Sequence, residues 1–195
     1  MTYTLVTLGL ILLTGIVFLP RFKLVLERQI HAVNFFLTLV ATLVGVLLAI
    51  AISNFEENRK EKQDVAKLIL ASIGSVETSR EYSQLLFEHY QSLSTDDVKR
   101  PTFFTKNILP YPDYLDVFIS QTIVSKNLSS AGLSDLNELL INLKRSKKQT
   151  PALYINILNR TEALLQTELR YQQGNIDYQD LELKLDAIEA QPFPE

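Results

Sequence analysis

The sequence predicts an all-α membrane protein: a two-helix transmembrane hairpin, a long stalk helix and a small α-helical soluble domain. Two long apolar stretches near the N-terminus predict the hairpin. Apolar residues at three- and four-residue steps after residue 53, with clear helix start and stop signals, predict the rest. We therefore divide the 195 residues into an anchor at 1–53, a stalk at 54–93 and a soluble domain at 94–195.

The more apolar stretch lies in a gap without Asp, Glu, Lys or Arg between Arg28 and Glu56. Residues 35–53 are nineteen uncharged, mostly apolar residues. At roughly 1.5 Å per residue they make about 28 Å of helix, close to the ~30 Å core of a bilayer. The alternative, a buried core helix of a soluble protein, fits this length and lack of charge less well.

The other apolar stretch, Tyr3–Leu19, is predicted to be a retained transmembrane helix. A cleaved signal peptide is the alternative, but the stretch lacks a basic segment before it and a small-x-small cleavage site after it. Two spans place both ends of the chain on one side of the membrane. Four basic residues follow the second span and three lie in the loop between the spans, so the positive-inside rule favours a cytoplasmic soluble domain.

The second span is predicted to continue into the stalk as one helix from about Ala32 to Leu93. Neither Pro nor Gly interrupts residues 54–64, and Glu56 and Lys60 stand at a favourable helical spacing. Two apolar stripes follow, at Val65–Val76 and Leu85–Leu93. Because a long helix with such stripes needs partners, we expect a bundle of identical stalks and hence a homo-oligomer.

The soluble domain is predicted to contain several shorter helices. Residues 102–111 form an ordered loop or extended segment, and Pro112 fits the first turn of a helix with an apolar face. Ser134 is the expected N-cap of a helix at 135–148. Thr150 and Pro151 begin the next helix, which should run to Gln173 and end at Gly174, and a short amphipathic helix follows.

The composition argues against several functions. There is no Cys, so thiol catalysis, disulfides and Cys-based metal sites are excluded. The residues after 53 carry 16 basic and 21 acidic side chains, which excludes a uniformly basic surface for duplex nucleic acid. Neither a Gly-x-Ser-x-Gly elbow nor a Gly-rich phosphate loop is present. The sequence therefore predicts no catalytic residue, no metal site and no cofactor.

One charge cluster stands out, with four cations in the five residues 144–148 at the end of a predicted helix. Basic residues at this place complement the helix macrodipole, and this role, which two of the four could serve by itself, is the favoured explanation. The alternative is an anion site, because the N-terminus of the next helix lies beside the cluster. The candidate ligand-binding residues are Lys144, Arg145, Lys147 and Lys148, joined by Lys126 and Arg160 if the helices pack as an antiparallel bundle.

Two resemblances add to this interpretation. The segment Leu43–Lys62, an apolar span that runs into Asn54-Phe55-Glu56-Glu57-Asn58-Arg59-Lys60-Glu61, resembles bacterial membrane proteins with Asn-Trp-Asn-Glu-x-Arg-Lys after a span, with Phe55 in place of the Trp. The overall plan resembles membrane effectors of bacterial antiphage defence. In particular, it is similar to the accessory membrane protein of type III CRISPR systems, whose cytoplasmic domain binds cyclic tetra-adenylate and forms a tetramer.

These resemblances imply a bacterial inner-membrane protein with a cytoplasmic, ligand-sensing domain that perturbs the membrane. The expected partners are the lipid bilayer, further copies of the chain up to a tetramer, and an anionic nucleotide ligand. The rival hypothesis is an extracytoplasmic sensor or scaffold, anchored by its spans, that acts through protein contacts. Residues from about Asp64 onward are expected to be soluble alone in either case.

Overall fold

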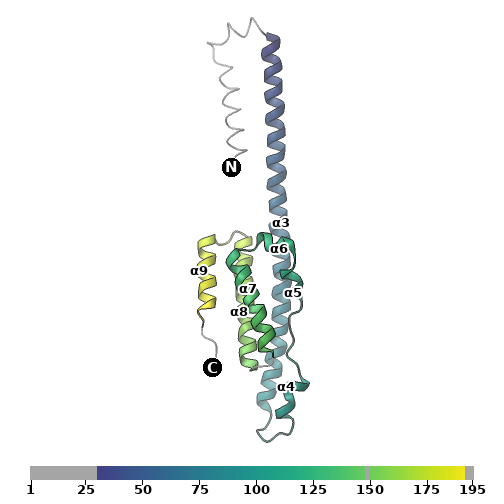
Figure 1. The fold of residues 1–195 in the computed structure, drawn as a ribbon, viewed down its shortest axis with the longest axis vertical. Coiled ribbons are helices and arrows are strands. Elements are labelled where there is room, and N and C mark those ends of the chain that lie inside the picture. Colours follow the sequence, from purple (N-terminus) through teal and green to yellow (C-terminus); the bar gives the residue numbers. More distant parts are fainter. Residues whose placement is uncertain (1–29, 148–149, 192–195) are drawn as a thin grey trace. The chain divides into compact units, whose positions relative to one another are not determined.

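The computed structural model describes residues 30–147 and 150–191, and these residues form helices joined by turns, without a strand (Figure 1). The elements are α3 (Ile30–Ser92), the 3₁₀ turn η2 (Arg100–Thr102), α4 (Phe103–Lys106), α5 (Tyr114–Ile119), α6 (Thr122–Asn127), α7 (Ser130–Ser146), α8 (Pro151–Gln172) and α9 (Tyr178–Glu189). The chain divides into two compact units, 1–60 and 61–195. The predicted first span, Tyr3–Leu19, lies outside the described residues.

In unit 1 the described residues are the first half of α3. The helix from Asn34 onward is long and apolar enough to cross a membrane, and its most apolar 18-residue window is 0% buried. Large side chains such as Phe35, Leu43 and Ile52 are exposed along it. One helix compatible with a transmembrane segment is therefore present near the N-terminus, whereas the two-helix hairpin remains a prediction.

The prediction of one continuous helix from about Ala32 to Leu93 is confirmed by α3. Its second half is part of the core of unit 2, because Val65, Ile69 and Val76 are fully buried against other parts of the same unit. The expectation that this stripe needs identical stalks is therefore corrected: the chain's own helices cover it. Leu85, in the second stripe, is 63% exposed.

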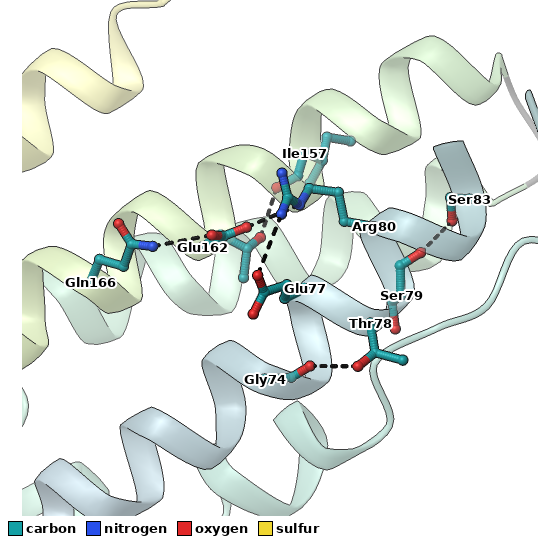
Figure 2. Close-up of polar contacts among 10 residues, drawn as sticks. Gly74, Glu77, Thr78, Ser79, Arg80, Ser83, Ile157, Glu162 and Gln166 are labelled. Atoms are coloured by element: carbon teal, nitrogen blue, oxygen red, sulfur yellow. Dashed lines mark hydrogen bonds and ion pairs between the residues drawn. The ribbon is translucent and has the colours of Figure 1, made fainter. Parts of the chain in front are cut away.

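In unit 2, helix α7 packs on α8 and α8 packs on α9. An ion pair joins α3 to α8, where Arg80 Nε lies 3.1 Å from Glu162 Oε2 (Figure 2). Gln166 donates a hydrogen bond of 3.1 Å to the same carboxylate, and Glu77 lies 3.9 Å from the guanidinium. The side chains of Arg80 and Glu162 are 27% and 17% exposed, so solvent screens this pair less than an open surface pair.

The ends of α8 follow the sequence signals. The helix starts at Pro151 after Thr150, and Gly174 adopts a φ of +74°. The Gly174 N–H donates to Tyr171 O at 2.9 Å and the Asn175 N–H donates to Arg170 O at 2.9 Å. These bonds satisfy carbonyl groups that the end of a helix leaves open, and Gly favours this left-handed conformation.

Two predictions, the start of α7 and the segment after Lys99, are wrong in detail. The helix begins at Ser130 rather than after Ser134, because Ser129 caps it: the Ser129 hydroxyl accepts a 2.9 Å hydrogen bond from the Gly132 N–H. The predicted loop or extended segment at 102–111 is wrong for its first half, because η2 and α4 occupy residues 100–106, while residues 107–111 lie in no helix or strand. The Phe103 ring of α4 contacts the rings of His89 and Tyr90 at the end of α3.

Candidate functional site

The basic cluster lies where α7 ends and α8 begins. Lys144 and Arg145 occupy the last turn of α7 and are exposed, and Lys147 is the half-buried C-cap. Lys148 lies outside the described residues. The structure therefore keeps three of the six candidate cations together at one end of the α7–α8 pair.

Lys144 is already engaged in an ion pair. Its Nζ lies 2.9 Å from Asp116 Oδ1 in α5 and 5.6 Å from the ring centre of Tyr111. The Tyr111 hydroxyl donates to the same Asp116 oxygen at 3.0 Å, and burial followed by this hydrogen bond raises the pKa of Tyr111. Because the Lys144 and Asp116 side chains are 55% and 46% exposed, the pair contributes little stability and can exchange for another anion.

Arg145 and Lys147 are the available cations of the cluster. Within residues 30–147 and 150–191, neither side chain makes an ion pair or a hydrogen bond. The adjacent start of α8 is also open, since the Thr150 side chain forms no capping hydrogen bond there. Free N–H groups at a helix N-terminus attract anions, so the geometry at this end suits a phosphate group.

Lys126 is not brought to this cluster. It lies in the last turn of α6, ahead of the N-terminal end of α7, whereas Lys144 lies about 21 Å further along the α7 axis. Its Nζ lies 2.7 and 2.9 Å from the two carboxylate oxygens of Glu61 in α3. Lys126 therefore forms an ion pair with α3, at a distance from the cluster.

Arg160 is also separate from the cluster. It is nine residues into α8, about 14 Å from Pro151 along the axis, and only 5% exposed. Its guanidinium donates to the carbonyl of Gln191, just after α9, and burial lowers the pKa of Arg160. The side chain lines a cavity of about 210 Å³ between α7, α8 and α9.

This cavity, which we call the acidic groove, is lined by three carboxylates and by several leucines. Its carboxylates are Asp135 and Glu138 from α7 and Glu189 from α9. Burial first, and then repulsion from Glu189, Glu138 and Asp186, raise the pKa of Asp135. The acidic groove therefore disfavours a phosphate ligand. Arg160 lies in acidic surroundings, unlike the exposed cations at the end of α7.

A buried polar cluster at the start of α7 was missed by sequence reasoning. Glu168 in α8 is 0% exposed and accepts a hydrogen bond from the Ser129 hydroxyl. Burial raises the pKa of Glu168, while its hydrogen bonds from Ser129 and Gln172 oppose that shift. Gly132 lets this carboxyl group lie directly against α7. Only the position of Glu168 on the apolar face of α8 signals the cluster in the sequence.

In the part of the chain that the structure describes, no group of three or more His, Asp or Glu side chains is placed to hold a metal ion.

Searches of protein-family models, curated proteins and solved structures gave no match to this chain.

Proposed function

We propose that this chain is an oligomeric membrane effector whose soluble unit senses a phosphate-bearing ligand. The apolar half of α3, together with the predicted first span, anchors it in the bacterial inner membrane with unit 2 in the cytoplasm. In line with the resemblance to antiphage effectors, the ligand is a cyclic oligonucleotide such as cyclic tetra-adenylate, and its binding leads to perturbation of the membrane.

The observation that supports this proposal is the end of the α7–α8 pair. Exposed Arg145 and half-buried Lys147 stand beside an N-terminus of α8 that lacks a side-chain cap, and Lys144 is held there by an exposed ion pair and by the Tyr111 ring. A phosphate group at this place gains charge-assisted hydrogen bonds and the favourable end of the α8 dipole. Lys148 belongs to the proposed site by its position in the sequence.

Ligand binding must favour one of two arrangements to act as a signal. The ion pair between Lys144 and Asp116 couples ligand binding to helix packing. A phosphate group that binds Lys144 breaks this pair and leaves the Asp116 carboxylate in α5 without it. Helix α5 carries Leu115 and Phe118, which are fully buried in the same core as Val65 and Ile69 of α3. Movement of α5 therefore changes the packing around the helix that carries the apolar segment.

Charge reversal at the cluster tests the proposal. Lys144→Glu with Arg145→Glu should abolish binding of cyclic tetra-adenylate in calorimetry while leaving the helical circular-dichroism signal intact. The matched control is Lys99→Glu with Lys106→Glu, two exposed cations elsewhere in unit 2, which should bind as the unchanged protein does. Binding by the unchanged protein should weaken steeply as salt rises, because phosphate contacts release counterions.

The dipole role predicts a different result. If the cluster only complements α7, then Lys147→Ala with Lys148→Ala should cost about 1 kcal/mol of stability and nothing more. No heat with any of a panel of cyclic nucleotides, from a folded protein, would contradict the ligand-sensing proposal.

The second candidate function is the extracytoplasmic sensor or scaffold that acts through protein contacts. It is favoured by exposed apolar side chains in unit 2: Leu85, Val98 and Ile108 are 63%, 89% and 64% exposed. A reporter fused to the C-terminus separates the two, because only a cytoplasmic unit 2 meets a cytoplasmic nucleotide.

A further inference from the structure

We infer that unit 2 carries a second anion site, a groove between α8 and α9 that takes a phosphate group through Arg170 and Lys184. The groove has a volume of about 250 Å³ and is lined from α8 by Ala163, Gln166, Thr167 and Arg170, and from α9 by Lys184 and Ala187. We call it the basic groove. The inference goes beyond the function proposed above, which uses other residues at the opposite end of α8.

The two cations of the basic groove are free to bind a ligand. Among the described residues neither Arg170 nor Lys184 forms an ion pair or a side-chain hydrogen bond. Lys184 stays unpaired even though Asp180 stands four residues before it on α9, at a spacing where helix ion pairs commonly form.

The two acidic side chains that α8 carries near the basic groove, Glu162 and Glu168, both have other partners, and Glu168 is fully buried with the Ser129 hydroxyl as its donor. Glu162 pairs with Arg80 of α3 at 3.1 Å and accepts from Gln166 at 3.1 Å (Figure 2). Its charge is thus largely compensated on the α3 side. Among the residues that line the basic groove, Arg170 and Lys184 are the charged ones, so the lining favours an anion.

The shape of the basic groove comes from small side chains. Ala163 on α8 and Ala187 on α9 leave space that larger residues would fill. The Thr167 hydroxyl donates to the Ala163 carbonyl at 2.8 Å, which fixes this part of the wall. The groove thus has a guanidinium from α8 and an ammonium from α9 in its lining, and both groups suit a phosphate, since Arg can bind two of its oxygens and Lys supplies a point charge.

The helix macrodipole explains the position of Arg170 but not that of Lys184. Arg170 lies in the last turn of α8, where a cation is favourable without any ligand. Lys184 lies in the middle of α9, so no helix end accounts for it. It lines the same groove as Arg170 from the other helix, as a phosphate site between α8 and α9 requires.

The basic groove is far from the end of α7. Arg170 is nineteen residues after Pro151, about 28 Å along α8. One phosphate group cannot contact both places, so the failure of either site leaves the other untouched.

The test uses adenosine monophosphate as the probe and the full-length protein in a maltoside detergent, which carries no phosphate. Arg170→Gln with Lys184→Gln should weaken binding by about tenfold or more, because two charge-assisted contacts are lost. Arg170→Lys with Lys184→Arg keeps both charges and should restore most of the affinity. Lys99→Gln with Lys106→Gln, two exposed cations outside both proposed sites, should leave this binding unchanged.

Equal affinity of the Arg170→Gln, Lys184→Gln variant and the unchanged protein, or no binding of the probe by the unchanged protein, would overturn the inference. A second experiment, in lipid nanodiscs, distinguishes a soluble phosphate ligand from a phosphate in a lipid headgroup. Adenosine monophosphate that binds equally in phosphatidylcholine and phosphatidylglycerol nanodiscs identifies a soluble ligand. Competition by phosphatidylglycerol, lost in the Arg170→Gln, Lys184→Gln variant, assigns the groove to a lipid headgroup instead.

Discussion

Gly132→Ala is expected to destabilise unit 2 by about 2–3 kcal/mol, although Ala is the better helix former. A Cβ at this position would overlap Glu168 Oε1 and would lie 2.8 Å from Glu168 Cδ and 2.9 Å from Ser129 Oγ. A surface Glu would swing away at little cost. Glu168 is 0% exposed, however, so the carboxyl group has no space to enter and would lose its hydrogen bond from Ser129.

The matched control is Gly74→Ala in α3. A Cβ there meets no atom within 4 Å, so this substitution should stabilise the protein by about 0.5–1 kcal/mol through helix propensity alone. Urea unfolding of the two variants measures the difference. A Gly132→Ala variant that gains stability as Gly74→Ala does would show that Glu168 does not press on α7.

A fragment that begins at the predicted domain boundary, residues 94–195, is expected not to fold, whereas residues 61–195 should fold alone. The shorter fragment lacks Val65, Ile69 and Val76, which are all fully buried in the core of unit 2. Each buried side chain of this kind contributes about 1.5–3 kcal/mol, so three of them amount to a large part of a total stability of about 5–15 kcal/mol.

Thermal unfolding followed by circular dichroism checks this prediction. The fragment 61–195 should show one cooperative transition, and the fragment 94–195 should show none. A cooperative transition of the shorter fragment would mean that α3 is only a tether and not part of the core.

Local signals in the sequence were sufficient for some elements. The continuous helix α3 follows from the uninterrupted helical pattern after residue 34, and the ends of α8 follow from Pro151 and Gly174. These features depend on a few neighbouring residues, because caps and turns are short-range interactions. The start of α7 was misplaced because Ser129 and Ser134 both suit an N-cap, and only contact with α8 selects Ser129.

The site depends on long-range packing, which the sequence did not reveal. Residues 144–147 were predictable as a group because they are contiguous. Lys126 and Arg160 could not be placed, since their positions depend on the order of α6, α7 and α8 in space. Arg170 and Lys184 were missed for the same reason: they are fourteen residues apart in sequence, and the loop that begins at Gly174 brings their helices together.

The central claim is that one helix, α3, contains both a membrane span and part of the core of unit 2. Alkaline carbonate extraction of membranes from cells that express residues 30–195 or residues 61–195 tests it most directly, because neither fragment contains the predicted first span. The account predicts that residues 30–195 stay in the membrane pellet and that residues 61–195 appear in the supernatant. Residues 30–195 in the supernatant, as a folded protein, would contradict it.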